Sequence, residues 1–549
     1  MPAGPLLTIL IFLPAVGALA LLFLRSDDHE WIRRLAFAVS LAEFILSLWW
    51  LLRGVPLGSA GYQLEEFHKW IDLGAHGSQS HTYINYHLGA DGISLFLVIL
   101  TTFLTVISIL CSWSSIQKRV KEFFIAILML EVGVVGVFLS LDLFLFFLFW
   151  EVMLIPMYLL IGIWGHDRRI YAAIKFILYT MAGSIFMLVG ILWLYNATGS
   201  FDLAGYHSLT ANISGIQEML QNGALILPRG TETLLFLAFF VAFAIKVPLF
   251  PFHTWLPDAH VEAPTAGSVM LAGVLLKMGT YGMMRFCLPL FPDASHRFAP
   301  VIAVLAIIGI IYGALVALVQ PNLKKLVAYS SVSHLGFVVL GIFAFHPISM
   351  QGAVFQMLAH GISTGGLFLL VGMLYDRRHT FEMSQFGGLA APMPRLAAFF
   401  LFVALSSLGL PMLNGFVGEF LILLGTYQVH WNWAAWAATG VILSACYLLW
   451  SYQKVFYGDV TVEKNRALPD ISARERAILV TMAVITLWMG IGSVFITGRT
   501  ASASQSVIDQ MTRPQRAEEA NKPSTSVPAA SIAPDVAPKQ NSPERLGTR

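Results

Sequence analysis

Charged side chains are scarce in this sequence. Asp, Glu, Lys and Arg together make up 12% of its 549 residues, about half of the roughly 25% that a soluble globular domain carries. The formal net charge is +2, which gives no indication of a nucleic-acid partner, and we expect none. With a hydrophobic share of 57%, this scarcity of charge excludes an ordinary soluble domain and indicates a membrane protein.

Cysteine is also rare. Cys111, Cys287 and Cys446 are scattered through apolar stretches, with neither the spacing of a metal site nor a disulfide pattern. The sequence has no Gly-rich phosphate loop, no cysteine cluster for an iron–sulfur centre and no evident flavin motif. We therefore expect no cofactor and no metal ion in this chain.

Long apolar runs are abundant. About fourteen runs of roughly 20 residues are long enough to cross a bilayer as helices. The first could pass for a signal peptide, but it lacks a basic leading region and a small-residue cleavage site, so we predict a membrane helix there. The fold class expected is an all-α polytopic membrane protein. The runs lie near 5–24, 33–53, 91–112, 121–139, 141–163, 170–195, 231–255, 263–290, 300–319, 323–343, 348–374, 394–426, 432–456 and 475–497.

Basic residues indicate which loops face the cytoplasm. Of the 33 Lys and Arg residues, most of those outside the spans and the C-terminal tail follow odd-numbered runs, among them Arg33, Arg34, Lys118, Arg377 and Arg378. These loops are predicted to be cytoplasmic. The chain is then a multi-pass protein of a bacterial inner membrane, with both termini on the periplasmic side.

Two predicted spans are interrupted. Residues 246–251 (KVPLFP) break the seventh run, and residues 408–415 (LGLPMLNG) break the twelfth. Proline removes a backbone donor and breaks a helix, and such breaks persist in membranes only where protein or a wet cavity satisfies the freed groups. Because the breaks lie five spans apart, runs 4–8 and 9–13 are predicted to be two inverted five-helix repeats with broken helices 7 and 12, as in transporters.

This pattern divides the chain into five parts. Residues 1–120 are expected to hold helices 1–3 and a long outer loop, 121–290 the first repeat and 300–456 the second. Residues 475–497 form helix 14. The stretch 498–549, rich in Ala, Ser and Pro, is predicted to be a disordered tail.

Ionisable side chains recur within the apolar runs. A charge at the bilayer centre costs about 2.5–3.5 kcal/mol on insertion scales, so each residue needs a reason. Burial lowers the pKa of a lysine, a neighbouring carboxylate raises it again, and histidine titrates near neutral pH. The alternation of these groups therefore predicts a proton path. Its members are Glu151, Lys246, Lys277, His334, His360 and Glu419, with Glu131 as a further candidate.

Each candidate also has a simpler explanation. Lys246 and Glu151 could form a structural ion pair, Lys277 could bind a backbone carbonyl, and Glu419 could cap a broken helix end. The histidines and Glu131 could be packing residues.

Two groups near the membrane surface also have simpler explanations. Lys324 and Lys325 could be positive-inside anchors, although Lys325 could extend the path to the cytoplasm. His253, Asp258 and His260 have a loose metal-like spacing, but metal binding is the less favoured reading.

Residues 246–282 (KVPLFPFHTWLPDAHVEAPTAGSVMLAGVLLKMGTYG) closely resemble the hallmark of the antiporter-like family. That family joins the large membrane-arm subunits of respiratory complex I to multi-subunit sodium/proton antiporters. Residues 141–165 and 323–342 resemble further family segments, and the similarity runs from about 90 to about 460. M-type complex I subunits typically carry Glu in the second broken helix where L-type, N-type and antiporter subunits carry Lys, so Glu419 favours the M type.

The resemblance implies roles for the buried groups. Glu151 becomes the partner of Lys246, Lys277 the connecting lysine, and His334 and His360 the link to Glu419, the residue toward the outside exit.

The resemblance also implies a function. The chain would be a non-redox, proton-translocating subunit of NADH:ubiquinone reductase (H⁺-translocating). NADH, FMN, iron–sulfur clusters and quinone would bind in partner subunits. The partners implied are the other membrane-arm subunits of complex I, especially the two sister antiporter-like subunits, together with membrane lipid. The alternative is a subunit of a multi-subunit sodium/proton antiporter.

Overall fold

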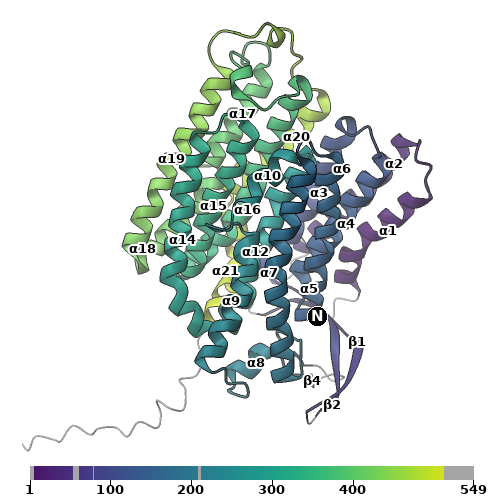
Figure 1. Ribbon diagram of the computed structural model, residues 1–549, viewed down its shortest axis with the longest axis vertical. Helices are drawn as coiled ribbons and strands as arrows, with labels where there is room; N and C mark the ends of the chain where they lie inside the picture. Colours follow the sequence, from purple (N-terminus) through teal and green to yellow (C-terminus); the bar gives the residue numbers. More distant parts are fainter. Residues whose placement is uncertain (1–4, 53–60, 78, 208–211, 512–549) are drawn as a thin grey trace, which may run out of the picture. The chain divides into compact units, whose positions relative to one another are not determined.

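The computed structural model describes residues 5–52, 61–77, 79–207 and 212–511, and these form a helical bundle with two small β-hairpins (Figure 1). The predicted all-α, polytopic class is confirmed. The α1–α2 pair lies at one flank of the bundle, and α18 and α19 lie at the opposite flank (Figure 1). The most buried helices, α15 and α16, lie between them.

The helices up to the first break follow the predicted runs closely. They are α1 (Leu6–Phe23), α2 (His29–Leu52), α3 (Gly92–Ser115), α4 (Val120–Leu139), α5 (Leu143–Val152), α6 (Leu154–Trp164), α7 (Arg169–Thr198), α8 (Ile216–Gln221) and α9 (Arg229–Lys246).

Beyond that break the helices are more often interrupted. They are α10 (Trp255–Glu262), α11 (Thr265–Met270), η1 (Leu271–Leu275), α12 (Leu276–Gly282), η2 (Met283–Cys287), α13 (Leu288–Leu290), α14 (Pro292–Leu318), α15 (Leu323–Phe343), α16 (Pro347–Arg378), η3 (Met383–Gln385), α17 (Pro394–Ser407), α18 (Asn414–Val429), α19 (Trp431–Phe456), η4 (Glu463–Asn465), α20 (Ala473–Ile491) and α21 (Val494–Asp509).

Ten helices of the described ranges are long and apolar enough to cross a membrane, and the pair α20–α21, bent by 66°, is an eleventh candidate. The other three predicted runs are α9, α11–α13 and α17–α18. Each of these carries several charges or is divided into shorter helices. The chain is thus a multi-pass membrane protein, while the count of fourteen and the inverted repeats stay predictions.

Both predicted breaks are present, and local groups satisfy the backbone that they free. After α9, the carbonyl of Ile245 accepts a hydrogen bond from Trp255 Nε1 at 2.8 Å, and that of Ala244 accepts from Leu249 N at 2.7 Å. After α17, the carbonyl of Leu405 accepts from Leu410 N at 3.0 Å. Broken ends in a membrane are therefore stabilised here by protein groups.

The predicted long outer loop is in part a β-hairpin. Strands β1 (Leu64–His76) and β2 (Gln79–Ala90) pair antiparallel, with Leu64 opposite Ala90. The segment YINYH (83–87) is rich in aromatic and β-branched residues, a composition that favours a strand. A second, two-residue pair joins β3 (Tyr206–His207) to β4 (Asn212–Ile213).

The prediction that the disordered tail begins at 498 is wrong, because α21 continues to Asp509. Its inward face holds Thr500, Ala503, Ser504 and Val507, all buried. The small residues that suggested disorder instead allow close packing of α21 against α3 and α16. The rest of the predicted tail, from 512 onward, lies outside the described residues.

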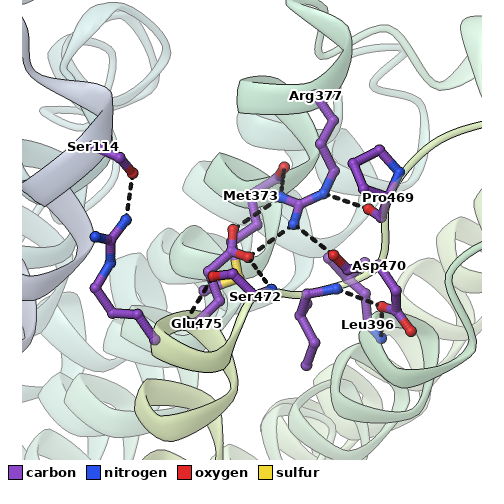
Figure 2. Close-up of polar contacts among 10 residues, drawn as sticks. Ser114, Met373, Arg377, Leu396, Pro469, Asp470, Ser472 and Glu475 are labelled. Carbon is purple, nitrogen blue, oxygen red and sulfur yellow. Dashed lines mark hydrogen bonds and ion pairs between the residues drawn. The ribbon is translucent and has the colours of Figure 1, made fainter.

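Arg377, near the end of α16, makes several hydrogen bonds at one end of the bundle (Figure 2). Its guanidinium donates to both carboxylate oxygens of Glu475 at 2.9 and 2.8 Å, and to the carbonyls of Met373, Pro469 and Asp470. The Asp470 carboxylate accepts from the backbone N–H of Leu396 in the first turn of α17. These bonds join α16, α17 and α20 at the end predicted to be cytoplasmic.

Candidate functional site

Lys246 lies at the last turn of α9, directly before the first break, and is 1% exposed. Its Nζ lies 3.7 Å from the sulfur of Met153, and 5.3 and 5.4 Å from the ring centres of Trp150 and Phe176. Glu151, in the last turn of α5, is the charged group that acts on this ammonium. No ion pair joins the two side chains in the part of the chain described, so the ammonium is held by aromatic faces and a thioether, which are weak partners.

Lys277 is fully buried in α12, between the two π-helical segments η1 and η2. Its Nζ contacts the carbonyl of Ala272 and lies 2.7 Å from Nδ1 of His360 in α16. A π-helical segment widens the turn and often marks a functional site. Lys277 therefore has one contact for each explanation offered for it. The carbonyl fits a structural role, and the imidazole fits a place in the proton path.

His334 of α15 joins the same cluster. Its ring centre lies 5.9 Å from that of His360, and its Nδ1 lies 2.7 Å from Oε1 of Glu419 in α18. The other ring nitrogen lies 3.2 Å from the hydroxyl of Tyr447. Glu419 is 3% exposed and also accepts from Gln356 Nε2 at 3.1 Å. The structure therefore brings Lys277, His360, His334 and Glu419 into one buried line.

The donors and acceptors along this line can each exchange a proton. When Lys277 is protonated, Nδ1 of His360 must accept, so the ring proton sits on Nε2, which is buried and has no partner. His334 donates from Nδ1 to a carboxylate and accepts at Nε2 from a hydroxyl. The arrangement passes from an amine through two imidazoles to a carboxylate.

Lys324, rather than Lys325, lies inside the protein at the start of α15. It is 2% exposed and donates to the carbonyls of Ala263 and Val261 at 2.5 and 3.3 Å. Lys325 is partly exposed, so its part at the cytoplasmic end of the path stays a prediction. Helical periodicity could not choose between adjacent lysines, because the basic end of a span faces both protein and headgroups.

His260, in α10, is a path candidate that sequence reasoning set aside. It is fully buried, stacked on Phe368 with ring centres 4.5 Å apart, and neither ring nitrogen has a partner. It lies close enough to Lys324 and to Lys277 to interact with both charges. Only its grouping with His253 and Asp258 drew notice in the sequence.

The other two residues of that grouping have partners of their own. Asp258 pairs with Lys175 at 2.6 Å, and His253 packs on Tyr312 with ring centres 5.2 Å apart. Within the described ranges, no three His, Cys, Asp or Glu side chains lie close enough together to hold a metal ion.

Glu131 lies in α4, apart from the line, and is fully buried. Its acidic neighbour is Glu43 of α2, also fully buried. Sequence reasoning missed Glu43, although it is the only charged residue that the run 33–53 holds away from its ends.

His166, in the loop between α6 and α7, is a titratable group near Lys324. Burial, and then the charge of Lys324, lower the pKa of His166 to about 4. His166 is therefore neutral at physiological pH.

The comparisons with known proteins identify the family of this chain. Residues 140–444 match the family described as "NADH:quinone oxidoreductase/Mrp antiporter, TM", and residues 70–135 match "NADH-ubiquinone oxidoreductase chain 4, amino terminus". The chain is 45% identical to NADH-quinone oxidoreductase subunit M of Rhodobacter capsulatus over 90% of this chain and 94% of that protein. It is 42% identical to NADH-ubiquinone oxidoreductase chain 4 of Marchantia polymorpha over 88% and 92%.

A solved structure has the same fold. A chain of respiratory complex I from Thermus thermophilus with bound NADH superposes with a TM-score of 0.80 at 30% identity. The match covers 92% of the present chain and all of the other.

Proposed function

We propose, since this chain belongs to the NADH:quinone oxidoreductase/Mrp antiporter family of membrane subunits, that it moves protons across the membrane as subunit M of proton-pumping NADH:quinone oxidoreductase. It is a multi-pass membrane protein of a multi-subunit complex. Oxidation of NADH and reduction of quinone take place in other subunits, which hold the FMN and iron–sulfur clusters.

The buried line from Lys277 through His360 and His334 to Glu419 carries this proposal. Its two hydrogen-bonding steps are 2.7 Å long, and the two rings between them are 5.9 Å apart. A structural role would require fixed charge pairs, whereas every member here can be both donor and acceptor. Such a line needs only rotation of the two rings, or one water between them, to pass a proton.

Lys246 and Glu151 are proposed to load this line from the first half of the chain. The lysine lacks a strong acceptor, so the position of the Glu151 charge decides how tightly its proton is held. When Glu151 is near, the amine stays protonated. When that charge withdraws, burial drives the proton off toward Lys277 and the line beyond it.

The cytoplasmic approach is proposed to run through Lys324 and His260. Their position between the α15 end and the Lys277–His360 pair supports this route. Glu419 is proposed to deliver protons toward the periplasm. The excess of basic residues in the odd loops supports this orientation, with both termini periplasmic in a bacterial inner membrane.

The partners proposed are the other membrane-arm subunits, especially the two sister antiporter-like subunits, together with lipid. The exposed apolar side chains of α7 and of α14 support contact with membrane or neighbouring subunits, among them Leu178, Val189 and Val301. A subunit of a sodium/proton antiporter is the second candidate. Glu419, in place of the Lys typical of those subunits, argues against it.

The decisive experiment replaces Glu419 in the assembled complex and measures quinone-coupled proton pumping in vesicles. Gln keeps the shape but cannot titrate, so Glu419→Gln should lower pumping by about a hundredfold, the usual contribution of a positioned proton-transfer group. Glu419→Lys should retain more activity. The structure allows for it, since His334 can change tautomer and Gln356 can turn its unpartnered Oε1 toward an ammonium.

Glu463→Gln, at an exposed carboxylate paired with Arg466, is the matched control and should pump as the wild type does. A merely structural cap predicts the reverse order, because Gln would still accept hydrogen bonds whereas a buried Lys would be unpaired. If the Gln variant pumped better than the Lys variant, Glu419 would not carry protons.

A further inference from the structure

Glu43 and Glu131 form a pair of acids that the line described above does not use. Glu43 lies on the inward stripe of α2, where Ser40, Glu43 and Ser47 follow one another at helical spacing and are all fully buried. Glu131 faces it from the middle of α4, and both residues lie near the middle of their spans. The two carboxyl groups thus meet at about mid-membrane depth.

Among the described residues, the pair has no compensating charge. All four carboxyl oxygens are buried and none makes a hydrogen bond of ordinary geometry. Helix α1, which packs on both α2 and α4, has no ionisable side chain, and α3 has only Cys111. The other elements packed on α4 carry Glu151 in α5, Tyr158 in α6, Lys277 and Tyr281 in α12, and His81, Tyr83, Tyr86 and His87 in β2, and none of these acts on the pair.

Two neighbouring carboxylates in an apolar interior cannot both ionise, because like charges repel and each loses its hydration. At least one proton must therefore remain on the pair. We propose that Glu43 and Glu131 share this proton, and that they constitute a second proton-binding site beside the Lys277–Glu419 line. The proposal deepens the proposed function and rests on it for its physiological use, but proton binding itself can be measured separately.

A row of hydroxyl groups on α3 leads from this pair toward one end of the bundle. Thr101, Thr105, Ser108 and Ser112 share one face at spacings of four, three and four residues, and none is more than 2% exposed. Thr105 lies beside Glu131, and the hydroxyl of Ser108 has no partner. The row covers about 10 Å between Thr105 and Ser112, at 1.5 Å per residue.

A small cavity lies where this row ends. It has a volume of about 20 Å³, enough for one water molecule, and is lined by Cys111, Ser114, Asp376 and Arg474 among others. The sulfur of Cys111 lies 3.9 Å from the hydroxyl of Ser112. The Arg474 guanidinium donates to the hydroxyl of Ser114 (Figure 2), and Glu475, the partner of Arg377, also lines the cavity. The α3 row therefore supplies the route by which a proton enters from this side.

The test is a pH titration of the intact complex followed by infrared difference spectroscopy of protonated carboxyl groups. Two acids that share a proton titrate in two steps separated by more than about one pH unit. Glu43→Gln and Glu131→Gln should each replace these steps by a single step at an intermediate pH, because the like charge is gone. The double variant should show neither.

Glu122→Gln is the matched control, since Glu122 lies on the same helix as Glu131 but is exposed and paired with Arg119. It should leave both steps unchanged. If the carboxyl group left in a single variant titrates at the same pH as in the wild type, the two acids are independent and the proposal is overturned. A wild-type signal that neither substitution changes would overturn it too. Either single variant suffices if the other does not assemble. A wild-type complex that shows both titration steps but pumps no protons would instead contradict only the proposed function.

The route is tested by the rate at which the same carboxyl signal exchanges in D₂O. Thr105→Val removes the hydroxyl next to Glu131 while keeping its shape, and should slow exchange severalfold without changing the titration steps. Exchange at the wild-type rate would show that protons reach the pair elsewhere and would remove α3 from the proposal.

Discussion

Three buried lysines differ in what holds them, and these differences are the residue-scale basis of the proposed path. Lys246 has aromatic faces and a thioether, Lys277 has a carbonyl and an imidazole, and Lys324 has two carbonyls. A charge with weak partners is the easiest to discharge in a low-dielectric interior. Lys246 is therefore suited to release a proton.

Lys246→Ala should lower quinone-coupled pumping about a hundredfold, because it removes a positioned proton-transfer group. The complex should still assemble, since Lys246 makes no ion pair on which packing depends in the described structure. Proton uptake by vesicles, with assembly checked by native electrophoresis, measures both. Lys464→Ala, in the surface helix η4, is the control. Normal pumping by an assembled Lys246 variant would contradict the assigned role.

Glu151→Gln should lower pumping nearly as much as Lys246→Ala, whereas Glu151→Asp should be partly tolerated. The proposed role depends on a charge near Lys246 more than on direct hydrogen bonding, because no ion pair within 4.0 Å joins them. The three rates can be compared in the same vesicle assay. Equal pumping by the Gln variant and the wild type would leave this carboxylate without a part in coupling.

At the scale of elements, the breaks after α9 and α17 could be predicted because proline and glycine have local effects. The sequence pattern also located most helices. It could not show that η1 and η2 interrupt the run 263–290, since π-helical turns arise from packing rather than composition. Nor could it bring Glu43 to Glu131, or choose Lys324 over Lys325, because these depend on the rotation of each helix about its axis.

Gly409 in the second break adopts a positive φ of 85°, and an added Cβ would lie 3.3 Å from Oε2 of Glu419. Gly409→Ala should therefore destabilise the complex by about 1–2 kcal/mol, the cost of a left-handed conformation for other residues, and should lower pumping. Gly498→Ala is the opposite control, because nothing lies near that helical position and Ala stabilises a helix by about 1 kcal/mol. Thermal melting of the two variants should shift in opposite directions.

At the scale of the whole molecule, α21 shows that the ordered bundle continues beyond the last run that hydropathy detects. Ending the chain after Thr512 should leave assembly and pumping unchanged, since α21 is complete. Ending it after Gly492 should reduce assembly strongly, because Ile496, Ala503 and Val507 no longer fill their sites against α3 and α16. The amount of assembled complex in purified membranes measures the difference. Equal assembly of the two truncations would show that α21 adds nothing to the bundle.

The bend between α20 and α21 has a consequence for biogenesis. An added Cβ at Gly490 would meet the carbonyl of Met412 in the second break, and one at Gly92 would meet that of Arg499, so the bent pair closes on both the break and the start of α3. Because α21 follows every other described helix in chain order, α3 can be covered only after nearly all of the chain has left the ribosome. Until then, the nascent protein exposes the start of α3 in the membrane, where insertase chaperones and membrane proteases act. Chains stalled before residue 494 should be the ones they degrade.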